Sequence, residues 1–150
     1  MVEPQVSRKV GMPLKVREII KMVESDGWSL ARTRGSHRQY VHPTKRGVVT
    51  IAGNPSADLP RGTERSIPEA DGTVMGGATM SGYAIVVEQA EDGGYGAWSP
   101  EVPGCVALGA TVDETVAEMR VAIKLHLELL AERGEPLPLP TAVRVDLLAA

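Results

Sequence analysis

The chain has 150 residues, enough for one ordinary domain or two small ones, and its five aromatic residues include no phenylalanine, so any core must be aliphatic. Its single cysteine excludes an internal disulfide and is typical of a reducing compartment. No apolar run is long enough to span a membrane, and the N-terminus lacks the apolar segment of a signal peptide. We therefore expect a soluble cytoplasmic protein.

Charge is divided unevenly between the two halves of the chain. Residues 1–67 carry 12 Lys and Arg against 6 Asp and Glu, a net charge of +6, whereas residues 68–150 carry 4 against 13, a net charge of −9. A basic half indicates an anionic partner such as a nucleic acid. The acidic half could equally be the partner of the basic half, or both could be ordinary solvated surfaces.

The first half begins with one helix followed by three strands. Residues 1–13 are expected to form an unstructured leader. Apolar residues from Leu14 to Val23 recur at helical spacing, and Asp26-Gly27 ends this amphipathic helix. Alternating and β-branched residues then predict three antiparallel strands, at residues 28–32, 37–42 and 48–51.

A second helix begins in the first half and is cut short. Thr63 is a candidate N-cap for a helix within residues 61–67, and Pro68 stands at its first turn or just beyond it. Residues 68–82 contain several glycines and small polar residues and have the composition of a linker.

The second half is predicted to open with three strands. A strand at residues 83–88 and its partner at 95–99 flank a hairpin turn at Asp92-Gly93-Gly94. Residues 100–105 contain two prolines and are expected to bend the chain before a third strand at residues 106–110.

A long helix and a last strand complete the second half. Thr111 or Asp113 would cap the helix, which reaches about Arg133. Residues 142–147 alternate and predict the last strand, so the order is βββαβ and the whole chain is α+β. The apolar stripe of the helix consists of Val116, Met119, Ile123, Leu127 and Leu130.

The stretch Arg34-Gly35-Ser36-His37-Arg38 places a histidine among hydrogen-bonding and cationic neighbours at the start of a predicted strand. Gly35 lets the backbone approach a partner closely, and arginines bind phosphate oxygens. Histidine side chains gain or lose a proton near neutral pH, so His37 could act as a general base on RNA. In the alternative interpretation, His37 is an ordinary residue at a strand entry beside solvated arginines.

The first half resembles the HicA toxin family over residues 14–67. This resemblance implies a small double-stranded-RNA-binding-like fold of order αβββ, here with a truncated second helix. It also implies cleavage of messenger RNA by His37. The features that carry the resemblance are the short amphipathic helix, Asp26-Gly27-Trp28, Gly35-Ser36-His37 with Tyr40 after it, Val48-Val49-Thr50-Ile51 and the Gly62-Thr63 helix start.

The second half resembles the HicB antitoxin family over residues 83–147. The resemblance implies a partial ribonuclease-H-like fold without working catalytic carboxylates, which binds the HicA-like half and covers His37. The toxin-then-antitoxin order and the charge division make the combined resemblance specific. It is carried by Asp92-Gly93-Gly94-Tyr95, Pro100 to Cys105, Gly109-Ala110-Thr111 and the helix that follows.

Other charged residues are candidates for RNA binding and for inhibition. Cations near a general base would offset phosphate charge, and an inhibitory half needs acidic groups against the basic half. No metal-ligand set is visible, so we expect cleavage without a metal or other cofactor. The RNA-binding candidates are Arg34, Gly35, Ser36, Arg38, Lys45 and Arg46. The candidates for the inhibitory interface are Glu88, Glu91 and Asp92, although acidic residues around a hairpin are more often solvated.

Three further residues that could do chemistry have ordinary interpretations. His42 precedes Pro43 and more often ends a strand. His126 lies beside the apolar stripe as a flanking or contact residue, and Cys105 is expected to be a small buried residue.

Two departures from the families leave a second function open. The short second helix would weaken the nuclease, so the chain could be a non-catalytic antitoxin or RNA-binding module that carries a truncated toxin relic. HicB proteins often have a C-terminal DNA-binding segment, and none follows residue 147, so DNA binding is not expected. A plain double-stranded-RNA binder is a third, weaker interpretation.

The predicted organisation is thus a two-domain α+β protein. It comprises a leader (1–13), a HicA-like domain (14–67), a linker (68–82) and a HicB-like domain (83–150). Contact between the two domains is expected within one chain or between chains, and the protein is expected to form a homo-oligomer without membrane attachment.

Overall fold

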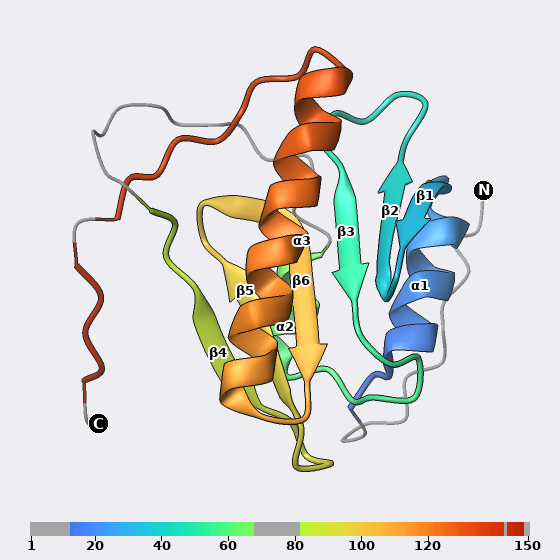
Figure 1. Ribbon diagram of the computed structural model, residues 1–150. Coiled ribbons are helices and arrows are strands. Elements are labelled where there is room, and N and C mark those ends of the chain that lie inside the picture. Colours follow the sequence, from blue (N-terminus) through green and yellow to red (C-terminus); the bar gives the residue numbers. More distant parts are fainter. Residues whose placement is uncertain (1–12, 68–81, 143, 149–150) are drawn as a thin grey trace.

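The computed structural model describes residues 13–67, 82–142 and 144–148, in which three helices and six strands form an α+β fold (Figure 1). Of the predicted leader it includes only Pro13, and of the predicted linker only Gly82; the rest of both lies outside the described residues. The elements in chain order are α1 (Val16–Ser25), β1 (Ser29–Arg34), β2 (His37–Val41), β3 (Val49–Ala52), α2 (Arg61–Ser66), β4 (Val86–Gln89), β5 (Tyr95–Ser99), β6 (Val102–Gly109) and α3 (Val112–Glu132).

The six strands form one sheet that continues from the first half of the chain into the second. Their order is β1-β2-β3-β6-β5-β4. Every neighbouring pair is antiparallel except β3 and β6, which run parallel at the junction. There Thr50 pairs with Cys105, Ile51 with Val106, and Ala52 with Ala107. Backbone hydrogen bonds therefore join the two halves directly.

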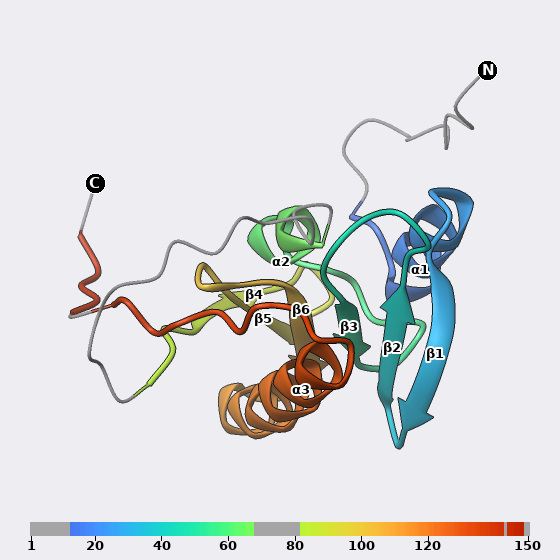
Figure 2. The same cartoon turned by 90° about the horizontal axis from the view of Figure 1, so that it is seen from above.

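The helices cover both faces of this sheet. Helices α1 and α2 lie on one face and α3 lies on the other (Figure 2). Side chains alternate between the faces along a strand, so β6 sends Val106 and Leu108 toward α1 and Cys105 and Ala107 toward α3. The central strand of the second half thus contributes to both layers.

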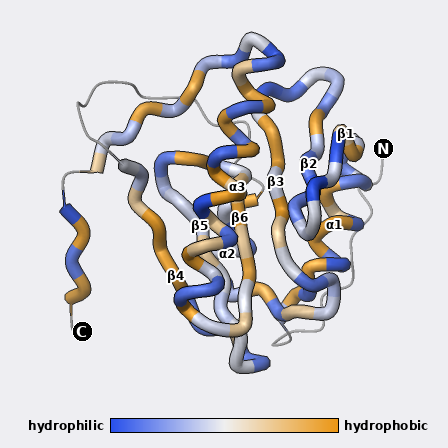
Figure 3. Tube along the Cα trace, viewed as in Figure 1, coloured by the Kyte–Doolittle hydropathy of each residue, from blue (hydrophilic) through white to orange (hydrophobic). Residues whose placement is uncertain are grey.

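The core under α1 is assembled from both halves. Figure 3 shows apolar residues along β3 and β6, at the centre of the sheet. The α1 side of this region includes Val106 and Leu108 from the second half, both nearly fully buried. Its other members come from the first half: Leu14, Val16, Ile19, Val23, Trp28, Tyr40, Val49, Ile51, Leu59 and Ile67.

The core under α3 also crosses between the halves. Met119, Ala122 and Ile123 of α3 pack on small residues of β5 and β6 and on Ala52 of β3. Nearer the end of the helix, Leu129 and Leu130 pack on Val48. Helix α3 therefore covers strands from both segments.

Three details of the sequence-based prediction were wrong. Strand β6 begins at Val102, because a bulge opposite Trp98 and Ser99 and the left-handed backbone of Gly104 (φ +81°) accommodate the prolines that were expected to bend the chain. Thr63 does not cap α2. Instead, the extended backbone of Pro60 precedes the helix, and Thr63 is buried within it. Finally, residues 144–148 form no strand, since no partner strand lies beside them among the described residues.

Strand β5 lies very close to α2 and to Pro60, the residue before this helix, at Gly96. A Cβ atom at this position would lie 2.7 Å from both Pro60 Cδ and Thr63 Oγ1. We expect Gly96→Ala to push α2 off the sheet and to lower the free energy of unfolding by about 1–3 kcal/mol in urea titrations. Gly82→Ala is the matched control, because a Cβ there meets nothing within 4 Å. Equal stability of the two variants would contradict this account of the α2 contact.

Candidate active site

His37 is the first residue of β2, directly after a tight turn. Gly35 adopts φ +58°, a left-handed conformation that favours glycine, and this brings Arg34 opposite His37 in the hairpin. The histidine is only 7% exposed, because its side chain points under α3. The local sequence thus builds the turn, and the second half buries its histidine.

Glu118 of α3 lies over His37 and contacts its side chain. The Nε2 atom of His37 lies 3.2 Å from the backbone oxygen of Glu118 and 3.3 Å from its carboxylate. The hydroxyl of Ser36 donates to the same carboxylate at 3.3 Å. Because both oxygens near Nε2 are acceptors, Nε2 carries a hydrogen and has no free lone pair in this arrangement.

Two further acidic residues of α3 face the arginines of β1. Glu132 accepts a hydrogen bond from Arg32 at 3.2 Å, and Glu128 lies 3.9 Å from Arg34. These side chains are partly exposed, so each pair contributes only about 0–1 kcal/mol. Together with Glu118, these residues place acidic side chains of α3 opposite the basic β1–β2 hairpin along most of the length of the helix.

A buried chain of hydrogen bonds runs beneath these surface pairs. Arg32 Nε donates to Gln39 Oε1 (2.8 Å), which fixes the orientation of the amide, and Gln39 Nε2 then donates to Thr50 Oγ1 (3.2 Å). Thr50 Oγ1 in turn lies 2.8 Å from Nδ1 of His126, to which its hydroxyl donates. The chain therefore leads from β1 through β2 and β3 to α3, and it specifies a neutral His126 with its hydrogen on Nε2.

Burial lowers the pKa of His126 to about 3. The unfolded chain therefore binds a proton at this residue between its ordinary pKa of about 6.5 and pH 3, whereas the folded chain does not. Stability from this group is fully present above pH 6.5 and decreases as the pH falls below it. We expect a loss of about 2 kcal/mol between pH 7 and pH 5, measured by urea denaturation.

Two histidine variants test this assignment of the pH dependence. His126→Asn keeps an acceptor near the Nδ1 position but cannot titrate, so its stability should change little between pH 7 and pH 5. His42→Asn is the control and should keep the decrease of the wild type. If both variants behave alike, His126 is not the source.

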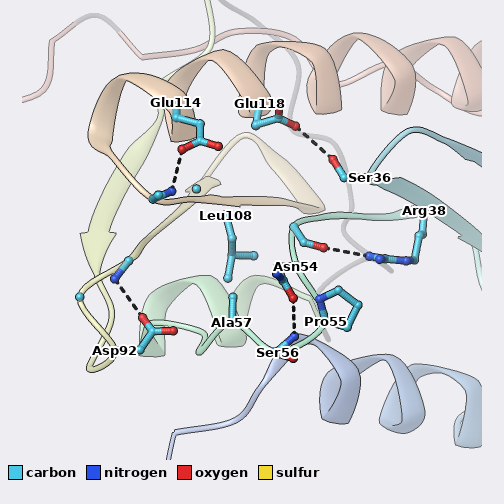
Figure 4. A pocket seen from close by; sticks show the side chains of 15 residues that line it. Ser36, Arg38, Asn54, Pro55, Ser56, Ala57, Asp92, Leu108, Glu114 and Glu118 are labelled. Atoms are coloured by element: carbon cyan, nitrogen blue, oxygen red, sulfur yellow. Dashed lines mark hydrogen bonds between the residues drawn. The ribbon is translucent and has the colours of Figure 1, made fainter.

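The predicted RNA-binding residues fall into two groups. Ser36 and Arg38 line a pocket of about 880 Å³ between the two halves, next to His37, and Arg38 donates to Gly53 O at 3.2 Å (Figure 4). Arg34 is the last residue of β1, and Gly35 lies in the turn that follows it. Lys45 and Arg46 follow the opposite end of β2, where Lys45 forms an ion pair with Asp26.

Two of the three predicted inhibitory residues, Glu88 and Asp92, contact the first half away from His37. The carboxylate of Glu88 accepts a hydrogen bond from Thr63 N at 3.0 Å, and that of Asp92 accepts one from Asp58 N at 2.9 Å. The latter bond is the main cause of a lowered pKa of Asp92. Glu91 is exposed in the β4–β5 turn. These contacts lie at α2 and the loop before it, on the sheet face opposite α3.

The contacts made by Glu118, Glu128, Glu132 and His126 were missed at the level of sequence. Of the predicted apolar stripe, Met119, Ile123 and Leu130 are buried, and Val116 and Leu127 are half-buried. The missed signal was a second row beside that stripe, formed by Ala122, Leu125 and Leu129, all of which are buried. An apolar arc this wide indicates a helix that packs on more than one neighbour.

The remaining candidate residues have structural roles. His42 donates from Nε2 to Asp26 O and accepts from Thr44 N and Lys45 N at Nδ1, as expected of a residue that ends a strand. Cys105 is fully buried, as predicted, and burial raises the pKa of its thiol. Within residues 13–67, 82–142 and 144–148, no group of three or more His, Cys, Asp or Glu could hold a metal ion, and no helix is long and apolar enough to cross a membrane.

Fold and contacts define a two-part protein in which the second part packs an acidic helix over a histidine of the first. Residues 16–72 match the family described as HicA toxin of bacterial toxin-antitoxin, and residues 83–149 match the family described as HicB-like antitoxin of bacterial toxin-antitoxin system. The chain therefore belongs to both families, in that order, and is a toxin–antitoxin module in one polypeptide.

Individual relatives match parts of the chain. A UPF0150 protein of Synechocystis sp. is 36% identical over 56 residues, which are 37% of this chain and 71% of the relative. A UPF0150 protein of Thermoplasma acidophilum is 30% identical over 67 residues, 45% of this chain and 97% of the relative. An uncharacterized 14.9 kDa protein of Haemophilus phage HP1 is 39% identical over 56 residues, 37% of this chain and 41% of the relative.

Proposed function

We propose that the HicA-like half is an endoribonuclease for messenger RNA and that the HicB-like half of the same chain keeps it inactive. The observation that carries this proposal is the position of α3 over His37, whose Nε2 atom contacts the backbone and the carboxylate of Glu118. An imidazole that is covered and hydrogen-bonded in this way can neither meet an RNA strand nor accept its proton at Nε2.

The proposed chemistry is general base catalysis by His37. Neutral imidazole takes the proton of a ribose 2′-hydroxyl, the oxygen forms a bond to the adjacent phosphorus, and the bond to the 5′-oxygen breaks. The leaving 5′-oxygen takes a proton from water. Arg34 and Arg38 lie close enough to the turn to offset charge on the phosphate. Cleavage is expected to proceed without a metal or other cofactor.

Each half of the chain is also proposed to have the fold of its family. Residues 14–67 are proposed as a double-stranded-RNA-binding-like domain and residues 83–150 as a partial ribonuclease-H-like domain, with a leader and a linker outside them. RNA would bind at Arg34, Gly35, Ser36 and Arg38, and more weakly along Lys45 and Arg46. The protein would act in the cytoplasm, where messenger RNA is present.

A second candidate function is a non-catalytic antitoxin or RNA-binding module that carries a toxin relic. It is favoured by the length of α2, which has six residues and leaves the first half to complete its core with Val106 and Leu108. A toxin domain that needs residues of its inhibitor to complete its core could not fold and act by itself.

The two candidates differ in what happens when α3 is loosened in the whole chain. Charge reversal of Glu118, Glu128 and Glu132 to lysine replaces three attractions to the hairpin with repulsions. At about 0–1 kcal/mol per pair, the combined change of up to about 3 kcal/mol would raise the open population by up to about 150-fold. Cleavage of a labelled RNA should increase accordingly, and His37→Ala in the same background should abolish it.

A matched control changes the same charge elsewhere. Glu24→Lys, Glu91→Lys and Asp146→Lys alter three exposed acidic residues outside α3, and this variant should remain as inactive as the wild type. If the α3 variant stays folded, binds the RNA and still does not cut it, the relic interpretation replaces the latent nuclease. Cleavage that survives His37→Ala would rule out His37 as the base.

A further inference from the structure

The C-terminal tail, residues 144–148, has the sequence of a strand but lies beside none. All five of its residues are exposed, including Val145 at 64%, Leu147 at 100% and Leu148 at 91%. Large apolar side chains in consecutive exposed positions are unfavourable in water. The tail therefore has apolar surface that the single chain does not cover.

Charged and apolar residues alternate along the tail from Arg144 to Leu147, as they do in a strand with one covered face. Arg144 Nε donates to Asp146 Oδ2 at 2.7 Å, which places these two side chains on one side of the backbone. If the tail pairs as a strand, Val145 between them and Leu147 would therefore point to the other side. This arrangement suits an outer strand with one face against a protein layer and one face in solvent.

The edge of β4 is the complementary feature. Strand β4 is the last in the sheet order, so its outer backbone N–H and C=O groups have no strand partner among the described residues. Unpaired edges of this kind readily accept another strand. The side chains of Val86 and Val87 in this strand are only half-buried, so an added strand would cover more of them.

An anchor holds the base of the tail at the end of the sheet where β4 begins. The carboxylate of Glu101 accepts hydrogen bonds from Ala84 N (2.8 Å), just before β4, and from Thr141 N (2.7 Å) and Ala142 N, just before the tail. The hydroxyl of Tyr83 donates to Pro138 O at 2.6 Å. Beyond this anchor the tail lies apart from β4 of its own chain (Figures 1 and 2).

We propose that two copies of this chain exchange their tails, so that residues 144–148 of each copy add as an outer strand to the free edge of β4 in the other. The two copies would be related by a two-fold axis, as in an isologous dimer. Each tail would then pair with the free edge of β4 in the other copy, and the apolar side chains of both tails would be covered. Backbone hydrogen bonds between the tail and β4 would provide the affinity, and the packing of Val145 and Leu147 would fix the register of the two strands. The exchange is independent of any ribonuclease activity.

The mass of the whole chain in solution tests this proposal. Size-exclusion chromatography with light scattering should give the mass of two chains at micromolar concentration. Val145→Asp with Leu147→Asp should give the mass of one chain, with an unchanged circular dichroism spectrum, because these two side chains are exposed and no described residue of the same copy covers them. Arg144→Ser with Asp146→Ser alters the opposite side and should remain a dimer. A wild-type chain that is monomeric throughout, or a dimer that survives the aspartate pair, overturns the proposal.

Cysteine pairing distinguishes exchange from pairing within one chain. One version would carry Gln89→Cys at the exposed end of β4, and a second version would carry Leu148→Cys or Arg144→Cys in the tail; the native Cys105 is buried. A disulfide between the two differently tagged versions after mixing and oxidation supports exchange. A disulfide that forms only when one chain carries both cysteines shows that the tail pairs with its own β4, and overturns it.

Discussion

Residues 13–67 expressed alone are expected to be unfolded. Without the second half, the core under α1 loses Val106 and Leu108, whose burial contributes about 1.5–3 kcal/mol each. It also loses the parallel ladder on β3 and the cover that α3 places over Val48 and Ala52. Since a small domain has only about 5–15 kcal/mol of stability in total, these losses exceed what a 55-residue fragment can sustain. Circular dichroism and amide dispersion in NMR spectra would report the outcome.

The whole chain provides the control for this expectation. Trp28 lies in the first half and Trp98 in the second. The single variant Trp28→Phe therefore keeps a tryptophan only in the second half, and the single variant Trp98→Phe keeps one only in the first half. If the shared sheet makes one cooperative unit, both reporters should follow the same urea transition as circular dichroism. A dispersed spectrum from the isolated fragment, or two separate transitions in the whole chain, would show that the halves fold independently.

This expectation also determines how the latent nuclease must be tested. A fragment that cannot fold will not cut RNA whether or not His37 is a competent base. Activity has to be sought in the intact chain with α3 loosened, where the toxin half keeps the core that β6 provides. A negative result from the fragment alone would therefore not distinguish the two candidate functions.

Replacing Thr50 by valine is expected to destabilise the protein by about 2–5 kcal/mol. The side chain keeps its shape but loses the hydroxyl that accepts from Gln39 and donates to Nδ1 of His126. Both of these groups are buried, and each loses a hydrogen-bond partner at a cost of about 1–3 kcal/mol. Urea denaturation at pH 7.5, where His126 is neutral in both states, measures this loss without a contribution from its titration.

Two substitutions make this measurement specific to the hydroxyl. Thr50→Ser keeps the hydrogen bonds and removes one methyl group, so its loss should be about 1 kcal/mol. Thr33→Val makes the same chemical change at an exposed position of β1 and should stay within about 0.5 kcal/mol of the wild type. A Thr50→Val variant as stable as Thr33→Val would mean that the buried chain of hydrogen bonds contributes no net stability.

The local elements were predictable because their signals are local. Helical spacing from Leu14 to Val23 predicted α1, whose described bounds differ by two residues from the expected ones. Thr111 caps α3 as one of the two expected residues, and its hydroxyl accepts from Glu114 N. Asp92-Gly93-Gly94 marked the turn between β4 and β5. Each of these features depends on interactions within a few residues, which the sequence displays directly.

The acidic residues of the second half that contact His37 and the arginines could not be predicted from local signals. Glu88 and Asp92 were candidates because they are acidic and close together around a turn, yet both bond to backbone N–H groups near α2. Glu118 reaches His37 only because α3 packs on β6 and β3, beside the start of β2. A charge count shows that two segments attract each other, but it does not show which faces meet.

By itself, the sequence determined the toxin and antitoxin families, the α+β class, the strand that begins with His37 and the opposite charges of the two halves. These depend on residue identity and short-range spacing. The tertiary structure decided that β3 and β6 pair in parallel, that both halves share their cores, and that α3 closes over the histidine. Parallel pairing between strands more than fifty residues apart leaves no periodic signal in either strand, because both already have the apolar pattern of a buried strand whichever neighbour they take.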